Sequence, residues 1–198
     1  MDGSLGERAM SSPIEYSFDE RLQMSQGVSA NTSVADILIT NIPGACSVNF
    51  AHSCNDRQGT DWWVEHSSGK HLSIDCKVRA EDWQRKGSDD LALEIWSVVE
   101  KKAVGWTRKP DKRTDYVLWL WTDTGRWCLI PFPFLCQVFG LHWEAWALKY
   151  KTSKQKTTTA YGSYHSQCVF VPRLVVWREI YQVFGGNPAA KIILPVSP

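Results

Sequence analysis

The sequence predicts an α/β domain, because two kinds of segment follow one another along its 198 residues. Short runs rich in Trp, Val, Leu and Ile, which are typical of β-strands, recur between residues 61 and 131. Apolar residues at helical spacing follow over residues 134–150 and 174–184. The chain is long enough to bury one substantial core, and we expect a flexible arm over residues 1–13 and a single domain over residues 14–198.

The first two strand-like runs predict a β-hairpin. They cover residues 61–65 and 71–78 and are separated by Ser67-Ser68-Gly69, which is typical of a three-residue loop with glycine in the left-handed conformation. A loop of this length pairs His66 with Lys70. The register of every residue further along the two strands follows from that pair.

The predicted register brings two carboxylates together. Asp61 falls directly opposite Asp75, with β-carbons about 5 Å apart, and Lys77 follows two residues later on the same face. A two-residue loop at Ser68-Gly69 would instead set Asp61 opposite Cys76, whose side chain points to the other face. The prediction of a carboxylate pair therefore depends on the loop type.

Two adjacent carboxylates and a lysine favour metal-assisted cleavage of a phosphodiester. Ionised carboxylates this close repel each other, and Mg²⁺ or Mn²⁺ held by Asp61 and Asp75 would relieve the repulsion. Lys77 would then either stabilise the transition state or help to position and deprotonate the attacking water. The alternative is an ion pair between Asp75 and Lys77 on a solvated strand face, worth only about 0 to 1 kcal/mol.

Asp61 together with Asp75-Cys76-Lys77 resembles the signature of the PD-(D/E)XK nuclease superfamily, an acid on one strand and Asp/Glu-x-Lys on the next. Thr60 stands where that signature usually has proline. The resemblance covers about residues 59–135 and looks most like nucleases of phages and mobile elements. It implies a restriction-endonuclease-like core, in which a central mixed β-sheet is flanked by helices, with residues 136–198 as a C-terminal elaboration.

Three further runs are predicted strands of this core, at residues 91–99, 115–121 and 126–131. Glu94 lies near the centre of the first run among Ala, Leu and Ile, and we expect it to be an auxiliary acid of the catalytic site. A buried ion pair with a lysine is the alternative. Glu94 can enter the site only if its face of the sheet is shared with Asp75.

In the resembled fold, a helix before the first core strand often supplies another acid. Residues 14–27 are expected to form such a helix, with Glu20 as the candidate acid and Glu15 as the alternative. An exposed helical carboxylate is the competing interpretation for both. A second helix is expected after Ser33, closed by Pro43-Gly44 and followed by an irregular link to the first strand.

Contacts with nucleic acid must come from local patches, because a net charge of +1 gives no overall attraction. One basic run lies within residues 101–113. Another, over residues 149–156, is expected to be a loop that holds backbone phosphates through Lys149, Lys151, Lys154 and Lys156. Solubilising loops are the alternative for both runs. Trp83 lies among charged residues and is the ring most expected to be exposed to a substrate.

Six cysteines without a Cys-x-x-Cys pair predict free thiols, which are typical of a reducing compartment. Residues 1–12 lack the apolar centre of a signal peptide, and no apolar stretch of about 20 residues is present to span a membrane. These features predict a cytoplasmic protein without a membrane partner. Serine-hydrolase, nucleoside-triphosphatase and zinc-site patterns find no support in the local sequence.

The combined prediction is a divalent-metal-dependent endonuclease acting on nucleic acid, in the first place DNA. Its catalytic residues would be Asp61, Asp75, Lys77 and Glu94. The competing hypothesis is a nucleic-acid- or protein-binding module of the same fold without turnover, such as a phage or plasmid accessory factor, which the near-neutral charge favours. A homodimer would suit double-strand cleavage, although no sequence feature encodes one.

Overall fold

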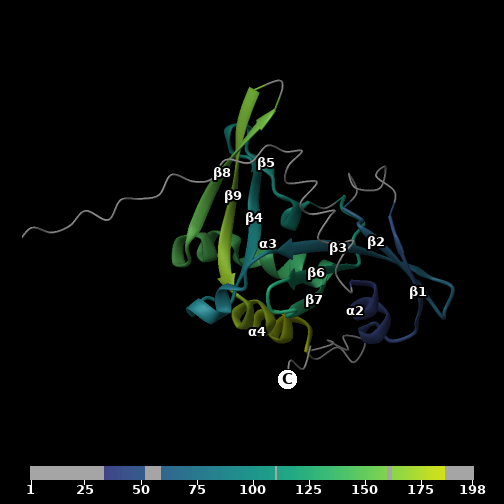
Figure 1. The fold of residues 1–198 in the computed structure, drawn as a ribbon. Coiled ribbons are helices and arrows are strands. Elements are labelled where there is room, and N and C mark those ends of the chain that lie inside the picture. The colour runs from purple at the N-terminus through teal and green to yellow at the C-terminus, as the bar shows by residue number, and fades with distance from the viewer. Residues whose placement is uncertain (1–33, 52–58, 110, 160–161, 186–198) are drawn as a thin grey trace, which may run out of the picture.

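The computed structural model describes residues 34–51, 59–109, 111–159 and 162–185, which form an α/β fold built on two β-sheets (Figure 1). The first sheet has the strand order β1-β2-β3-β6-β7 and the second has the order β5-β4-β9-β8. The strands of the first sheet are β1 (Ala45–Phe50), β2 (Trp62–His66), β3 (His71–Arg79), β6 (Tyr116–Trp121) and β7 (Trp127–Pro131). The strands of the second sheet are β4 (Asp90–Val98), β5 (Ala103–Val104), β8 (Thr152–Thr159) and β9 (Gly162–Pro172).

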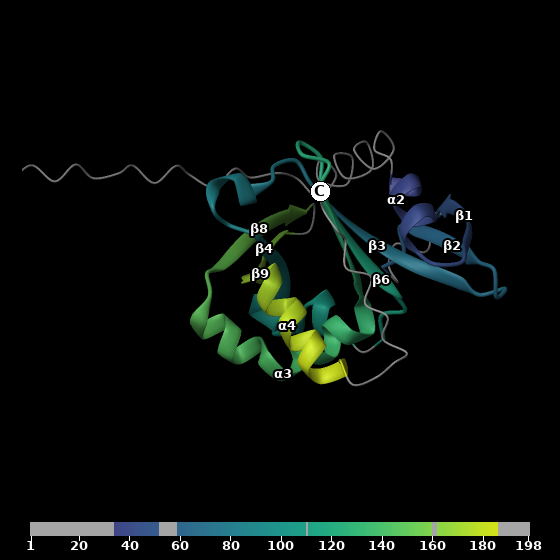
Figure 2. The ribbon, with the colours of Figure 1, turned by 90° about the horizontal axis from the view of Figure 1, so that it is seen from below.

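Helices cover both faces of the first sheet. The α-helices of the described chain are α2 (Val34–Asn41), α3 (Phe132–Lys149) and α4 (Arg173–Phe184), and its 3-10 turns are η2 (Trp83–Lys86), η3 (Val99–Lys101) and η4 (Trp106–Arg108). Figure 2 shows α3 and α4 in the angle between the two diverging sheets, with α2 on the other side of the first sheet. No helix within these described segments is both long and apolar enough to cross a membrane.

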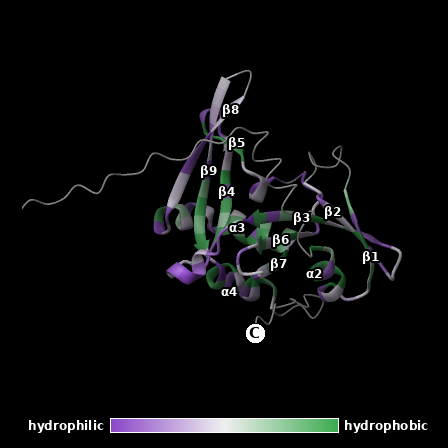
Figure 3. Ribbon diagram, viewed as in Figure 1, coloured by the Kyte–Doolittle hydropathy of each residue, from purple (hydrophilic) through white to green (hydrophobic). Residues whose placement is uncertain are grey.

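Two hydrophobic cores follow from this layering. The larger core combines apolar side chains of both sheets with those of α3 and α4, and Leu93, Trp119 and Phe139 are almost fully buried in it. The smaller core lies between α2 and the opposite face of the first sheet, where Leu38 and Ile74 are completely buried. In Figure 3, green segments of β4 and of the end of β9 nearer α4 mark the apolar part of the second sheet, whereas β8 is pale or purple.

Strand β3 lies in the interior of the first sheet, antiparallel to β2 and parallel to β6. Ile74 and Cys76 point into the smaller core, while Asp75 and Lys77 share the other face with Val117 of β6. Parallel strands that are buried on both faces have nearly continuous apolar sequences, as in the run from Tyr116 to Trp121. The chemistry-bearing residues of β3 are therefore set into a buried part of the fold.

The structure corrects the expectation of one central sheet. The predicted strand at residues 91–99 does not lie beside β3, because β4 belongs to the second sheet and β6 occupies that place. On β9, Val171 and Val169 lie directly opposite Leu91 and Leu93 of β4. The two strands together present one apolar face to α3 and α4, which explains why β4 pairs with a strand from much later in the chain.

Two segments that were expected to be irregular are strands. Residues 45–50 form β1, and most of the basic run at 149–156 belongs to β8. Both lie at sheet edges, and main-chain pairing defines them. Strand β8 is polar throughout, whereas β1 is a short strand of mixed polar and apolar residues. Helix α3 continues through Gly140, and the predicted helix at residues 14–27 lies outside the described residues.

Candidate active site

The β2–β3 hairpin has the predicted register. The His66 N–H donates to the Lys70 carbonyl at 2.8 Å, and Gly69 adopts a positive φ of 77°. Glu65 then pairs with His71, as counting outward from a three-residue loop requires. The three-residue loop is therefore confirmed, and the two-residue alternative is excluded.

Asp61 lies immediately before β2, where the paired register with β3 ends. Trp62 pairs with Ile74, and the Asp61 N–H also donates to the Ile74 carbonyl, at 2.8 Å, so the predicted direct opposition of Asp61 and Asp75 is not part of the regular pairing. The Asp61 carboxylate accepts a hydrogen bond of 2.7 Å from the Cys76 N–H. The two predicted metal ligands are thus neighbours across adjacent strands, with the Asp61 carboxylate beside the Asp75–Cys76 peptide.

Asp75 is buried between two lysines. Only 2 % of the residue is exposed, yet Lys77 Nζ lies 2.6 Å from its Oδ1 and Lys112 forms an ion pair with its Oδ2. The side chains of Lys77 and Lys112 are 25 % and 8 % exposed. The ion pair between Asp75 and Lys77 is therefore present, in the interior rather than on a solvated strand face.

The charges of this cluster shift one another's pKa values. Burial alone would raise the pKa of Asp75, but the two ammonium groups outweigh it and the pKa is lowered. Burial likewise acts to lower the pKa of Lys77, but Asp75 outweighs it and the pKa is raised. For Lys112 burial prevails over the attraction of Asp75, and the pKa is lowered. Asp75 and Lys77 are therefore a firmly charged pair at neutral pH.

Glu94 reaches this cluster from the second sheet. Its carboxylate accepts a hydrogen bond of 2.8 Å from the Trp106 N–H. Gly105 permits this approach, because a β-carbon there would lie 2.3 Å from the Glu94 carbonyl oxygen. Burial raises the pKa of Glu94, although the bond from Trp106 and the two site lysines oppose the shift. Glu94 thus does not share a sheet face with Asp75, but it interacts with the same lysines.

The ring of Trp106 joins the two halves of the cluster. The Nζ atoms of Lys77 and Lys112 each lie 4.8 Å from its centroid, within the range of a cation–π contact. The ring also stacks on Phe132 at the start of α3, with centroids 5.9 Å apart. One tryptophan therefore contacts both lysines through its ring and Glu94 through its backbone.

Lys112 is the member of this cluster that the sequence placed only in a basic run, expected to contact nucleic acid or to form a solubilising loop. It lies in the basic run at residues 101–113, four residues before a buried strand that runs parallel to the Asp-x-Lys strand. That position is the one sequence signal that could have revealed it. Arg108 of the same run is also packed against other residues and does not simply extend into solvent. Its guanidinium lies 5.1 Å from the ring centroid of Trp96 and 4.0 Å from that of Trp143.

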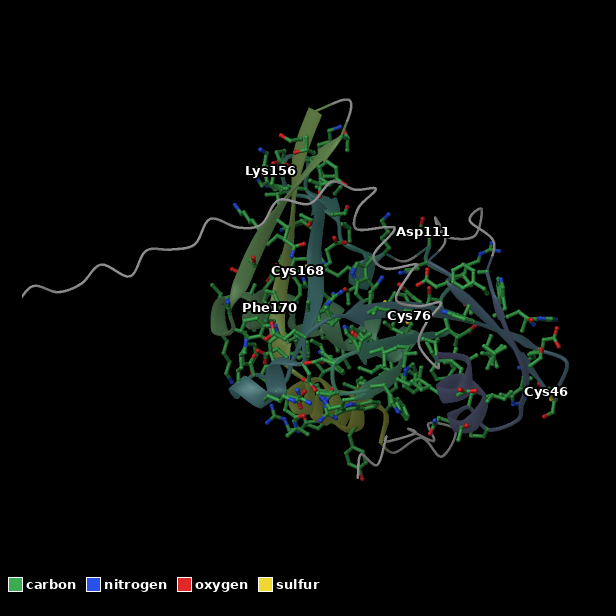
Figure 4. The ribbon with its side chains drawn as sticks, in the orientation of Figure 1. Cys46, Cys76, Asp111, Lys156, Cys168 and Phe170 are labelled. Carbon is green, nitrogen blue, oxygen red and sulfur yellow. The ribbon has the colours of Figure 1, made fainter. Side chains whose placement is uncertain are left out.

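The lysines predicted to bind nucleic acid are not gathered at this site. Across β9, Lys154 of β8 pairs with Gln167, and Glu94 of β4 pairs with Cys168. Gln167 and Cys168 are successive residues of β9. Because successive residues of a strand point to opposite faces, Lys154 lies on the face of the second sheet away from Glu94, and so does Lys156. Figure 4 shows Lys156 near the outer end of β8, apart from Cys76, the neighbour of Asp75.

The other predicted contact residues lie on the surface. Lys149 ends α3, and the ammonium of Lys151 lies 5.9 Å from the Phe170 ring centroid. Trp83 is 53 % exposed, as predicted, with the Lys86 ammonium 4.2 Å from its ring centroid. These residues lie at the surface, whereas the ion-pair partners of Asp75 are Lys77 and Lys112.

The thiols next to the cluster are unsuited to nucleophilic attack. Burial raises the pKa of Cys76 to about 12, and it has the same effect on Cys168, whose pKa is also about 12. Both thiols therefore stay protonated at neutral pH. All described cysteines, Cys46, Cys76, Cys128, Cys136 and Cys168, are free, as predicted.

Asp61 and Asp75 are carboxylates of the type that binds a small divalent cation, and in this structure both oxygens of Asp75 are paired with lysines. Mg²⁺ is commonly bound by one or two carboxylates, with waters and substrate phosphates as the remaining ligands, and Asp61 and Asp75 supply that number of hard oxygen donors. No group of three or more His, Cys, Asp or Glu side chains suited to a metal occurs within the described ranges. Glu20 and its alternative Glu15 lie outside those ranges.

Comparison of the chain with protein-family models, with curated proteins and with solved structures gives no significant match. The functional assignment therefore has to rest on the geometry and chemistry of the cluster.

Proposed function

We propose that the chain is a divalent-metal-dependent nuclease that hydrolyses phosphodiester bonds, with DNA as its substrate. The observation that carries this proposal is the Asp61 carboxylate beside the Asp75–Cys76 peptide, with Lys77 ion-paired to the buried Asp75. A buried ion pair is often no more stabilising than apolar packing, so stability alone is a weak reason to keep one. Buried charges with shifted pKa values are instead concentrated at sites of chemistry.

The first sheet supports the same proposal. It is mixed, helices cover both of its faces, and it carries an acid just before β2 and Asp-x-Lys on β3, as in the PD-(D/E)XK nucleases that the sequence resembles. We infer a restriction-endonuclease-like core in this sheet, of the phage or mobile-element type. The second sheet then becomes an elaboration that supplies Glu94.

The residues divide the work of hydrolysis between them. Asp61 and Asp75 would hold Mg²⁺ or Mn²⁺, which supplies a Lewis acid to the phosphate and lowers the pKa of bound water. Lys77 has a raised pKa, so it stays protonated and stabilises the negative charge that develops on the phosphate oxygens. The same raised pKa disfavours Lys77 as the base that deprotonates water. Glu94, whose pKa is raised by burial, is the auxiliary acid that can accept or return a proton.

Exposed lysines outside this cluster would hold the DNA backbone. Lys149, Lys151, Lys154 and Lys156 are the candidates, and all four are exposed. Lys151 is the strongest of them, because Lys154 and Lys156 lie on the face of the second sheet away from Glu94. The free thiols of the described cysteines support a cytoplasmic location for this activity.

The proposal is tested by incubating supercoiled and single-stranded DNA with the chain in the presence of Mg²⁺ or Mn²⁺. Lys77→Met should reduce cleavage by about 10²- to 10³-fold, the usual effect of removing one group that stabilises the transition state. Lys70→Met is the matched control, because Lys70 is an exposed lysine beside the β2–β3 hairpin loop and belongs to no proposed site, and it should cleave like the native chain. Equal cleavage by the native chain and Lys77→Met, or none by the native chain, would instead favour a binding module without turnover.

A further inference from the structure

Lys112 occupies a closely fitted position beside Asp75. Its side chain is only 8 % exposed. The ammonium lies 4.8 Å from the ring centroid of Trp106 and 5.3 Å from that of Phe132. A lysine that only solubilises a loop keeps its ammonium in water, whereas the Lys112 ammonium is enclosed by two aromatic rings and a carboxylate.

The backbone before β2 is shaped around the same side chain. Gly59 has a positive φ of 78°, and a β-carbon there would lie 1.9 Å from Lys112 Cε and 2.5 Å from Lys112 Nζ. The hydroxyl of Thr114 donates to the Gly59 carbonyl at 2.7 Å and holds this turn in place. Only glycine fits there without displacing the lysine. The position of Lys112 beside Asp75 therefore depends both on the segment that carries Lys112 and on the turn at Gly59.

Both oxygens of Asp75 are engaged by ammonium groups. Lys77 takes Oδ1 and Lys112 takes Oδ2, so a cation that binds to Asp75 meets a lysine at either oxygen. Lys77 lies two residues from Asp75 on the same strand face, and the geometry of β3 keeps that pair together. Lys112 comes from the segment between η4 and β6, so it is the partner that can leave without disturbing the sheet.

We propose that Lys112 is a resident counter-ion of Asp75 that competes with the divalent cation for this carboxylate. The competition sets the metal concentration at which the site fills. The inference rests on the proposed function, because it takes Asp75 to be a metal ligand. It adds that the chain carries its own competitor for that ligand, on a segment separate from the Asp-x-Lys strand.

The test is isothermal titration of the full chain with Mn²⁺ alone, without substrate. Lys112→Met keeps the apolar length of the side chain under the two rings and removes its charge, so it should bind Mn²⁺ at least about tenfold more tightly than the native chain. Lys112→Arg keeps the charge and should bind with near-native affinity. Lys70→Met removes the same type of charge from an exposed lysine outside the cluster and should leave the affinity unchanged. Circular dichroism checks folding, and Lys112→Gln is the second neutral variant if Lys112→Met does not fold.

The outcomes separate this inference from the proposed function. Tighter Mn²⁺ binding by the neutral variants, or binding that appears only in them, supports competition by Lys112. Unchanged or weaker binding by a folded neutral variant, with Mn²⁺ still bound and DNA still cleaved by the native chain, overturns the role of Lys112 and leaves the nuclease standing. Absence of Mn²⁺ binding and of cleavage in every variant overturns both.

Discussion

Asp75 and Glu94 are both shielded from solvent and both interact with Lys77 and Lys112, yet their pKa values move in opposite directions. Burial would raise both, but in Asp75 the direct ion pairs outweigh it, whereas in Glu94 burial prevails over a single backbone hydrogen bond. Two carboxylates whose pKa values are pushed apart suit two roles, one as a permanently ionised ligand and one as a group that exchanges a proton.

Substitution of Glu94 by glutamine tests this division. Because the folded-state pKa of Glu94 lies above its ordinary value of 4.5, ionisation of Glu94 destabilises the fold above that folded pKa. Glutamine still accepts the bond from the Trp106 N–H, so Glu94→Gln should be more stable than the native chain at pH 7 to 8. This gain should shrink as the pH falls through the folded pKa and vanish below the ordinary value. Cleavage should fall by about 10²-fold, as expected on removal of an acid–base group.

Urea denaturation across this pH range measures the stability, and the DNA assay measures cleavage. A stability difference that does not change with pH would contradict the raised pKa. Unimpaired cleavage by Glu94→Gln would remove Glu94 from the catalytic set while leaving its pKa assignment intact.

The proximity of Asp61, Asp75 and Lys77 could be predicted from the sequence, whereas that of Lys112 could not. Asp61, Asp75 and Lys77 belong to one hairpin, and a three-residue loop is enough to bring them together. Lys112 joins them only because β6 lies parallel to β3, a pairing between segments more than 30 residues apart that no local pattern encodes. Glu94 was predicted as a site residue, but its route through Trp106 depends on how the second sheet meets the first.

Replacing glycine by alanine should have opposite effects on stability in the β2–β3 hairpin loop and in helix α3. Gly69 has a φ of 77° in the hairpin loop, whereas Gly140 lies in the interior of α3, and neither has any atom within 4 Å of an added β-carbon. Gly69→Ala should lower the free energy of unfolding by about 1 kcal/mol through backbone strain alone. Gly140→Ala should raise it by about 0.5 to 1 kcal/mol through helix propensity. Denaturant unfolding of both variants checks this, and equal signs would contradict the assigned loop conformation.

A half-buried ion network joins the segments before η2, β4 and β7 to the start of α4. Arg126 donates to Asp82 at 2.7 Å and to Asp89 at 2.8 Å, and Asp89 also pairs with Arg173 at 2.9 Å. Arg126→Met leaves Asp82, which is only 3 % exposed, without its main partner and should cost about 3 kcal/mol of unfolding free energy. Arg85→Met is the matched control, because Arg85 is exposed and lies 3.9 Å from Asp123, so it should cost less than about 1 kcal/mol.

The dependence of stability on pH in acid provides a second test of the Arg126–Asp82 ion pair. Hydrogen bonds from Arg126, followed by those from Gln84 and Thr124, overcome the effect of burial and lower the pKa of Asp82 to about 2. Its stabilising contribution is therefore complete above the ordinary value of 3.8 and is lost as the pH falls through about 2. The Arg126→Met variant should lose less stability than the native chain over this interval. An unchanged acid profile would show that Arg126 does not hold the Asp82 pKa down.

Element prediction succeeded where apolar alternation was strong and failed at the sheet edges. Strands β4 and β6 have the apolar patterns that predict them. Strand β8 is polar and β1 is short and mixed in composition, and both are recognised through their pairing with β9 and β2. Their failure as predictions reflects main-chain hydrogen bonding, which is almost independent of side-chain type.

At the scale of the whole molecule, the fold brings distant segments to one place. The first sheet supplies Asp75 and Lys77, the second supplies Glu94, and the turns before β6 supply Lys112 and Trp106. The α/β class was predictable because strand runs and helical runs are distinct in the sequence. The division into two sheets was not, since it depends on β4 pairing with β9 about 75 residues later.

The central claim is that Asp61 and Asp75 together hold the cation that cleavage requires. The most direct measurement is the rate of cleavage of labelled DNA at graded Mn²⁺ concentrations by the native chain, Asp61→Asn and Asp36→Asn, the last being the substitution of an exposed carboxylate on α2. We expect Asp61→Asn to lose at least about 10²-fold in rate at every Mn²⁺ concentration, because one of two ligand charges is gone, while Asp36→Asn cleaves like the native chain. Equal rates for all three proteins, or no metal-dependent cleavage by the native chain, would contradict the account.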